Sequence, residues 1–350
     1  MHRRDVLRAL GGLWLAACGG ATGTAVAPSG KRESPASPLH VAHAADLAAA
    51  PGLTWLVDAR LRELFANADL IPALHLLVSE ARLDKFAARN GGVDPRQVRE
   101  LVAAQYGSDS LLVVATGLFD PAKLEATFSE RAAPLDGRAI DRANAPDGAT
   151  LVPITRLWGT IRSERQQLAI FGRDALALEQ GRFGPLRAAE AFAQGRLKRA
   201  RPALEAAPLA KPSELLGDAP LRMFAPGPFE GAWAQGLGGL LRASTAAALG
   251  VRALAPSSAS TGKPRLACTL VLTGGWGESA PAAGERLAAA FGRLAQDSLG
   301  RLCGLDRPLD GPHVRTAAEV LTLEVALDPY EIARGLRAAT EASVEEVMSY

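Results

Sequence analysis

The chain has 350 residues, 48% of them hydrophobic and 22% charged, which is enough apolar material for one large domain or two ordinary ones. Its 39 basic and 37 acidic residues nearly balance, and beyond Cys18 the two signs are equal in number. Nucleic-acid binding requires clustered basic charge. We therefore expect no nucleic-acid partner.

The chain begins with a charged and then apolar segment. Arg3 and Arg4 precede an unbroken apolar stretch of nine residues, Ala9 to Ala17. A membrane-spanning helix needs about 20 such residues, so this stretch is too short to span a bilayer. Positive charge, a short apolar run and small residues are together typical of a secretory signal that is cleaved after export. Residues 1–17 are therefore predicted to be a signal peptide.

The end of this segment, Leu15-Ala16-Ala17-Cys18, resembles the lipobox of bacterial lipoproteins. The resemblance implies that Cys18 receives a diacylglyceryl group, becomes the first residue and is then acylated, for example with palmitate. Two or more acyl chains anchor a protein stably, whereas one binds a membrane only marginally. The alternative is an ordinary signal peptide with a cysteine there by chance. The resemblance thus implies contact with a membrane through Cys18 and a location in the cell envelope.

The residues around the paired arginines, His2-Arg3-Arg4-Asp5-Val6-Leu7-Arg8, resemble the twin-arginine export pattern. They depart from it because the first residue is usually Ser or Thr and the fifth is often Phe. The resemblance implies export of an already folded protein, and the general secretory route stays open. Gly19 is not the aspartate that retains enterobacterial lipoproteins at the inner membrane, which favours the outer membrane, facing the periplasm.

Residues 18–44 are predicted to form a lipidated flexible tether, because the segment up to His43 is rich in Gly, Ala, Ser and Pro. His40 and His43 stand three residues apart near its end. That spacing suits a metal on a helix, but no third ligand is visible in the sequence, so we interpret both as solvated linker residues. The sequence predicts no metal site and no cofactor.

Three Asp-Pro pairs occur after the predicted tether, and they begin at Asp94, Asp120 and Asp328. Each is followed by apolar residues at helical spacing. An aspartate that caps backbone N–H groups, with proline at the first helical position, is typical of a helix start. We therefore predict three capped helices. A catalytic use of these aspartates is the alternative, and the capping interpretation accounts for all three.

Alternating apolar residues predict strands, and apolar residues at helical spacing predict helices. The strands are expected at 111–117, on both sides of a hairpin turn at 163–165, and at 219–227, 265–275 and 320–326. The helices are expected at 185–195, 230–249 and 281–302. The mixture predicts an α+β fold with largely antiparallel sheets covered by helices.

A strand that enters an Asp-Pro helix occurs near the start of this region and again at the end of the chain. This recurrence hints at two related halves, which we place at residues 45–210 and 211–350. The strand, the helix after Phe119-Asp120-Pro121 and the later "LAIFGRDALALEQG" loosely resemble secreted bacterial proteins of unknown function. That resemblance implies no activity.

Cys268 and Cys303 are the only cysteines besides Cys18. The predicted compartment permits disulfides, so we expect these two to be joined. The alternative is two buried free thiols, because cysteine often serves as a small core residue.

The sequence contains no recognisable catalytic motif. His75 lies on an apolar segment and His313 in a loop, and nothing beside either of them stands out as a nucleophile. We therefore expect a binding, scaffolding or assembly module with an unknown envelope protein or ligand as its partner. The alternatives are an envelope hydrolase with unidentified catalytic residues and a carrier of an apolar ligand.

Overall fold

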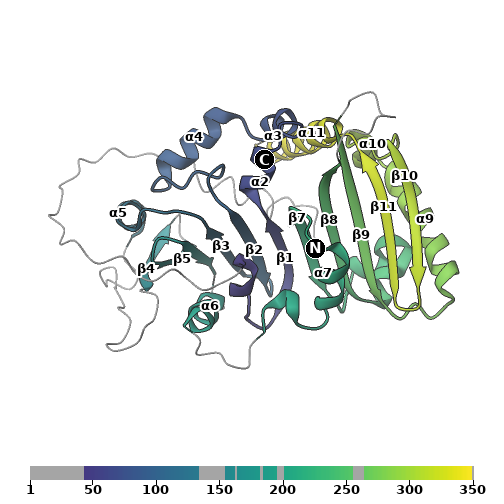
Figure 1. Cartoon of the computed structure of the whole chain (residues 1–350), viewed down its shortest axis with the longest axis horizontal. Helices are drawn as coiled ribbons and strands as arrows, with labels where there is room; N and C mark the ends of the chain where they lie inside the picture. The colour runs from purple at the N-terminus through teal and green to yellow at the C-terminus, as the bar shows by residue number, and fades with distance from the viewer. Residues whose placement is uncertain are drawn as a thin grey trace.

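The structure is a computed structural model that describes residues 43–133, 154–161, 164–181, 184–194, 201–254 and 264–348, with side chains as far as residue 340. The predicted signal peptide with Arg3, Arg4 and Leu15–Ala17, and the predicted lipidation site Cys18, lie outside the described residues. The fold is mixed α+β, as predicted. An 11-stranded sheet with antiparallel neighbours runs across the molecule in the order β10-β11-β9-β8-β7-β1-β2-β3-β6-β5-β4 (Figure 1).

The first part of the chain builds one side of this sheet. Its elements are the 3₁₀ turn η1 (Ala44–Leu47), β1 (Leu53–Ala59), α2 (Leu61–Ala66), α3 (Ile71–Leu77), α4 (Glu80–Arg89), β2 (Glu100–Tyr106), β3 (Ser110–Thr116), α5 (Pro121–Arg131), β4 (Ile154–Ile161), β5 (Glu164–Phe171), β6 (Ala175–Gln180) and α6 (Pro185–Ala193).

The second part builds the other side. Its elements are η2 (Ala203–Glu205), α7 (Ala210–Leu216), β7 (Leu221–Pro226), η3 (Trp233–Gly239), α8 (Leu240–Ala243), β8 (Ser244–Leu254), β9 (Arg265–Gly274), α9 (Ala280–Gln296), α10 (Ser298–Leu302), β10 (Asp310–Ala317), β11 (Val320–Leu327) and α11 (Pro329–Met348).

The strand order is nearly the same in both parts when it is followed outward from the central β1·β7 pair. One side runs β1-β2-β3-β6-β5-β4 and the other β7-β8-β9-β11-β10. In both, a helix follows the third strand, α5 or α9, and the next strands of the chain join the sheet beside that strand. They are the three strands β4, β5 and β6 in the first part and the hairpin of β10 and β11 in the second. The two units that are alike in sequence, β3–α5 and β11–α11, take different places in this arrangement. The sheet itself continues without a break between the two parts.

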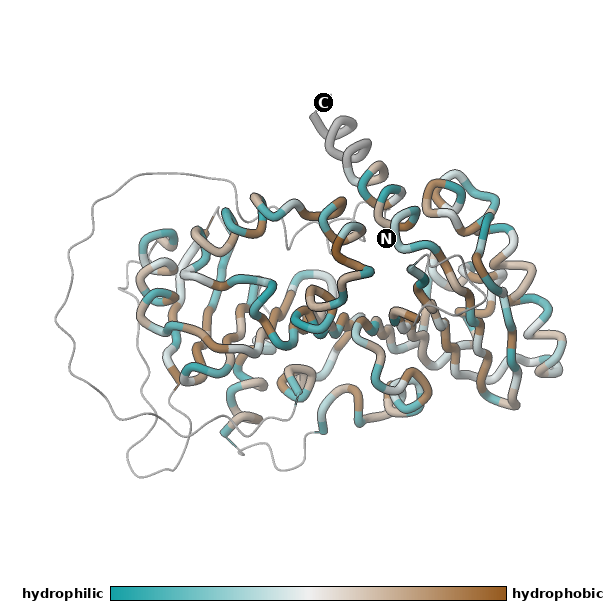
Figure 2. Tube along the Cα trace, turned by 45° about the horizontal axis from the view of Figure 1, so that its top comes forward, coloured by the Kyte–Doolittle hydropathy of each residue, from teal (hydrophilic) through white to brown (hydrophobic). Residues whose placement is uncertain are grey.

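The two faces of the sheet are covered differently. On one face, a single large core lies under η1, α6, η2 and α7 and includes Leu56, Phe171 and Phe224. On the other face, there are two separate cores, one under α5 around Phe128 and one under α9 around Phe291. Figure 2 shows α5 and α9 at opposite ends of the sheet, with α6 and α7 on its other side. The predicted cover of helices is therefore only partial on the second face.

Several predicted elements are confirmed. The hairpin around residue 163 is formed by β4 and β5, and the predicted strands at 111–117, 219–227, 265–275 and 320–326 are β3, β7, β9 and β11. The predicted helix at 185–195 is α6. The one at 281–302 is divided into α9 and α10 by Asp297, whose extended backbone ends the first helix and whose carboxylate accepts the Ser298 N–H at 2.8 Å.

The helix predicted at 230–249 is wrong. Only two short turns, η3 and α8, form there, and Leu237, Gly238 and Gly239 all have left-handed backbone conformations. From Ser244 onward the chain is strand β8. Alanine favours helices, but pairing with β7 and β9 on both edges outweighs that preference. Small residues are also needed where β8 packs against α7, because a Cβ at Gly250 would lie only 3.0 Å from the Leu216 side chain.

The Asp-Pro pairs have different outcomes. Asp120 caps α5 by accepting the N–H groups of Ala122 at 3.1 Å and Lys123 at 3.3 Å. Asp328 precedes α11 and accepts the Tyr330 N–H at 2.8 Å. The helix predicted after Asp94 is wrong, because only a turn follows and β2 begins at Glu100. The Asp94 carboxylate instead accepts hydrogen bonds from the backbone N–H and the side-chain Nε–H of Arg96. The apolar residues that follow belong to β2, which pairs with β1 and β3.

Within the described residues, no helix is both long enough and apolar enough to cross a bilayer.

Candidate functional site

The three central strands are fully buried on the face that carries the large core. Leu56 of β1 is aligned with Phe224 of β7, which is aligned with Ala248 of β8. These three side chains are 0%, 2% and 3% exposed. The first face of the sheet therefore offers no surface to a partner at its centre.

The opposite face of the same strands is apolar but not fully covered. Val57 is aligned with Met223, and Met223 with Leu249, so these side chains form a row across the sheet. Side chains two residues along each strand point to the same face. We call this surface the open face. It consists of the following half-buried residues, none of which belongs to the three cores: Trp55, Val57, Leu221, Met223, Ala225, Leu249 and Val251.

Helices stand on both sides of the open face. α5 packs over β3, β6, β5 and β4 through Leu124 and Phe128. α9 packs over β9 and β11 through Leu287 and Phe291. On β2, next to β1, Ala103 is buried, and on β8 Ala247 packs against the core under α9. The open face therefore lies between these two cores. Leu61 of α2 packs against the first core and Ile332 of α11 against the second, and α3 contacts both of these helices.

The open face carries no charge. The ionisable residues of the central strands are Asp58, Arg222 and Arg252. They alternate with the members of the open face and so point to the other face, where Asp58 pairs with Arg222. Contiguous apolar surface of this kind on a folded protein marks an interaction site more often than a scattered exposed residue does. The chemistry available here is apolar contact.

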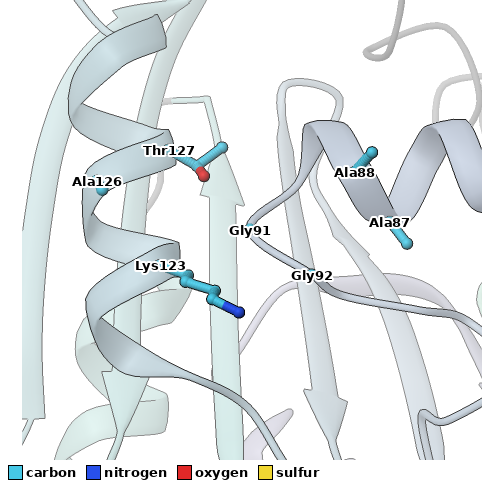
Figure 3. A pocket seen from close by; sticks show the side chains of 7 residues that line it. All are labelled: Ala87, Ala88, Gly91, Gly92, Lys123, Ala126 and Thr127. Atoms are coloured by element: carbon cyan, nitrogen blue, oxygen red, sulfur yellow. The ribbon is translucent and has the colours of Figure 1, made fainter. Parts of the chain in front are cut away.

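A hollow of about 420 Å³ lies elsewhere, between the end of α4 and α5 (Figure 3). Lys123 and Thr127 supply its polar side chains, and small residues, including Gly91 and Gly92, supply most of the remainder. The Lys123 Nζ lies 3.9 Å from Asp120 Oδ2, and both side chains are largely exposed. The hollow therefore offers one solvated ammonium group.

The histidines are separated from one another. His75 on α3 lies 3.6 Å from Glu80 Oε1, and His313 on the edge strand β10 lies 3.1 Å from Asp310 Oδ1. The hydrogen bond from His313 lowers the pKa of the Asp310 carboxyl. His43 Nδ1 lies 3.1 Å from Glu100 Oε1, and its predicted neighbour His40 lies outside the described residues. Among the residues that are described, no three His, Cys, Asp or Glu side chains are grouped as metal ligands.

Glu100 holds the start of the folded part in place. Its buried carboxylate accepts the Ala44 N–H at 2.7 Å, in addition to its contact with His43. Ala44, Ala45 and Leu47 are then buried in the large core. The predicted tether is therefore attached to the first residue of β2, near the middle of the sheet.

Cys268 and Cys303 are not bonded to each other in the structure, and the disulfide between them stays a prediction. Cys268 lies on β9 between Val251 of β8 and Val325 of β11, and burial raises its pKa to about 11. Cys303 ends α10 and is buried, which also raises the pKa of its thiol. Both thiols are thus protonated at neutral pH and are poor nucleophiles.

Sequence reasoning missed the open face. The strand at β7 was predicted, and its alternation of Leu221, Met223 and Ala225 with Arg222 and Phe224 was visible. Each face of β7 thus carries at least one large apolar residue, so the pattern alone predicts a strand that is buried on both faces. A comparison of this chain with protein-family models, with curated proteins and with solved structures found no match.

Proposed function

We propose that this chain is a lipid-anchored protein of the bacterial cell envelope whose folded part binds another envelope protein. The anchoring half of the proposal is supported by the lipobox resemblance at Leu15–Cys18 and by the tether-like composition of the residues that follow. The same proposal includes attachment to the outer membrane, with the folded part facing the periplasm. It also includes export by the twin-arginine route.

The open face carries the binding half of the proposal. It joins apolar side chains of three neighbouring strands, centred on Met223, which are half-buried and do not belong to the three cores formed by the described residues. A partner that covers this surface removes apolar area from water at about 25 cal/mol per Å². The same strands are well packed on their other face, so the fold does not depend on a partner to form its main core.

The other two candidate functions find less support. A hydrolase needs a nucleophile beside a base, and His75 and His313 pair with Glu80 and Asp310 on separate elements. A carrier of an apolar ligand needs an enclosed apolar cavity. Two hollows among the described residues are lined by residues other than those of the open face, and the smaller holds about 40 Å³.

The arrangement of elements also leads us to infer that the two parts of the sheet are related halves. The support is the shared outward strand order with a helix after the third strand. An element-by-element superposition in an experimental structure tests this, since unrelated halves would not align beyond single hairpins.

The anchor is tested by metabolic labelling with an alkyne-bearing fatty acid in cells that make the full-length chain. We expect label on the wild type, none on Cys18→Ser, and unchanged label on Cys268→Ser, which removes another thiol. Fractionation of the same cells should place the wild type with the outer membrane and Cys18→Ser in the soluble fraction. An unlabelled wild-type protein in the cytosol contradicts the proposed anchor and location.

A further inference from the structure

We propose that one end of the sheet, together with the helices α10 and α11 that lie on it, rests on the surface of a bilayer that contains anionic phospholipids. This inference rests on the proposed lipid anchor, because it names the part of the fold that the anchor turns toward the membrane. It does not involve the open face. It is carried by where exposed apolar side chains gather, by the arginines beside them and by the place where the described chain begins.

The alignment of the strands defines this end of the sheet. A row of aligned residues crosses six strands, from β2 to β11: Leu101, Ala59, Leu221, Val251, Cys268 and Val325. Just beyond this row, β1 leads into α2, β11 leads into α11, and β10 begins. We call this end the upper rim, because it lies at the top of Figure 1, where α3, α11 and α10 stand in a row.

Exposed leucines gather at the upper rim, on the end of α9, on α10 and on α11. We call them the leucine patch, and they are Leu294, Leu299, Leu302 and Leu336, with 44%, 46%, 48% and 37% exposed. The three helices touch, since α10 contacts both α9 and α11. A Cβ on Gly335, next to Leu336, would collide with the Leu302 carbonyl oxygen. Apolar side chains that gather in this way mark a contact surface more often than scattered ones do.

Arginines border the leucine patch. One exposed arginine stands beside a leucine of each of the three helices: Arg293, Arg301 and Arg337. Two acidic residues lie nearby and are engaged within the fold. The Asp297 carboxylate accepts the Ser298 N–H at the start of α10, and Glu331 pairs with Arg334. Leucines with cationic side chains next to them favour the interface of a bilayer with anionic headgroups.

The described chain begins at the same rim. Glu100, which holds Ala44 and contacts His43, is the first residue of β2 and lies one residue beyond the row that crosses the sheet. A flexible tether of the length predicted from Cys18 to His43 spans about 28 Å on average. The 11 residues of β8 alone measure about 36 Å. Acyl chains on Cys18 therefore bring the upper rim, and not the other end of the sheet, closest to a bilayer.

A protein partner would find less to bind at the leucine patch than a bilayer does. Protein partners bind most strongly where an anchoring side chain fills a pocket. Two hollows among the described residues are lined by other residues than these leucines. A bilayer interface needs no pocket, because it takes up exposed apolar side chains directly.

The test is photo-crosslinking from the upper rim in intact envelopes of cells that make the full-length chain. Benzoylphenylalanine replaces Leu302 or, in a second strain, Leu299. A matched control carries it in place of Trp233, which is 43% exposed and lies in η3, between the end of β7 and the start of β8 at the other end of the sheet. We expect phospholipid adducts from both leucine positions, identified by mass spectrometry. We expect about tenfold fewer from position 233, because the length of a strand, about 36 Å, separates it from the rim.

Vesicles of defined composition give the second readout. The purified lipid-modified protein, with the probe at position 299, is reconstituted in phosphatidylethanolamine with or without phosphatidylglycerol. Arg301→Gln should lower the lipid adduct about fivefold in the mixed vesicles, as expected for one arginine at an anionic surface, and should not change it without phosphatidylglycerol.

A carboxylate placed in the leucine patch extends this comparison. Leu302→Glu should lower the adduct from position 299 in both kinds of vesicle, because a carboxylate resists transfer out of water. The matched variant Trp233→Glu should leave it unchanged. Circular dichroism and thermal unfolding establish that the variants are folded, and Arg301→Gln keeps the test open if Leu302→Glu does not fold.

Four outcomes would overturn the inference: adducts with a protein in place of phospholipid, lipid adducts as frequent from position 233 as from the leucine positions, no adduct from either leucine position, and an adduct in mixed vesicles that Arg301→Gln does not change. Fatty-acid labelling of the same cells separates this failure from failure of the anchor. Labelled Cys18 without lipid adducts at the upper rim refutes the membrane-facing rim alone. Lipid adducts there without label on Cys18 refute the anchor and leave the rim in place.

Discussion

Asp58 of β1 lies directly opposite Arg222 of β7, and their side chains form an ion pair across the junction of the two parts of the sheet. Asp58 Oδ2 accepts hydrogen bonds from Nη2 at 2.5 Å and from Nε at 3.1 Å. Arg222 Nη1 also donates to the Gly217 carbonyl at 3.0 Å. The Asp58 side chain is 9% exposed, so this charge is removed from water and depends on its partner.

Replacing one member of this pair should destabilise the protein strongly. We expect Asp58→Asn to lower the free energy of unfolding by about 3 kcal/mol, because it leaves the Arg222 guanidinium partly buried without a counterion. Urea denaturation measures the loss. The matched control is Asp218→Asn, which removes a 92% exposed partner of Arg60 and should cost less than about 1 kcal/mol. Equal losses for the two variants would contradict the importance of the central pair.

The two faces of β7 should respond differently to truncation. Phe224→Ala removes a side chain from the large core and is expected to cost about 3–5 kcal/mol. Met223→Ala, one residue away on the open face, should cost about 1 kcal/mol, because part of that side chain already contacts water. Denaturation of the isolated protein compares them. A loss of several kcal/mol for Met223→Ala would show that the open face is covered within the chain itself.

The two remaining cysteines should be titratable as free thiols. In purified Cys18→Ser protein, unfolding without a reductant should expose two thiols per chain to a chromogenic disulfide reagent, because Cys268 and Cys303 are not bonded to each other. Prior reduction should not increase this number. Finding no thiol before reduction and two after it would restore the disulfide expected from the sequence.

Burial of Cys268 also predicts a pH dependence. Its pKa of about 11 lies above the ordinary value of 9.0, so the folded state holds the proton more tightly than the unfolded state. The stability that this gives is fully present below about pH 9 and is lost as the pH rises through about 11. Thermal unfolding between pH 8 and 11 should therefore show a shallower fall for Cys268→Ala than for the wild type. Parallel pH profiles would contradict it.

The cap of α5 should contribute measurably to stability. Asp120→Ala removes the acceptor for two backbone N–H groups and is expected to cost about 1 kcal/mol. Asp120→Ser retains a capping oxygen and should recover most of that loss. Chemical denaturation of the three proteins provides the comparison, and an Ala variant as stable as the wild type would mean that water replaces the cap at no cost.

Local patterns predicted those elements whose apolar residues differ clearly between the two faces. β11 was predicted because Leu321, Leu323 and Val325 alternate with smaller or polar residues. α5 was predicted because Asp120 and Pro121 mark its start. β8 was not, because its alanines favour a helix and its strand conformation depends on neighbours that are distant in sequence.

The candidate site was harder to predict for a related reason. Trp55, Leu56 and Val57 are consecutive and all apolar, which is typical of a strand buried on both faces. Which face is left uncovered depends on where α5 and α9 pack, and no local property of β1 determines this. The sequence also did not predict that one sheet continues past the expected boundary at residue 210. This continuity results from the pairing of β1 with β7, which are far apart in the sequence, whereas the patterns used for prediction are local.

The position of Glu100 has a mechanical consequence. Because its carboxylate holds the backbone of Ala44, a force on the amino-terminal segment is transmitted to β2, which has strands paired on both sides. A load on β2 acts on a strand that is hydrogen-bonded along both edges, whereas a load on an outermost strand such as β10 acts on a strand that is bonded along one edge only. The predicted tether would therefore pull on an interior strand of the sheet.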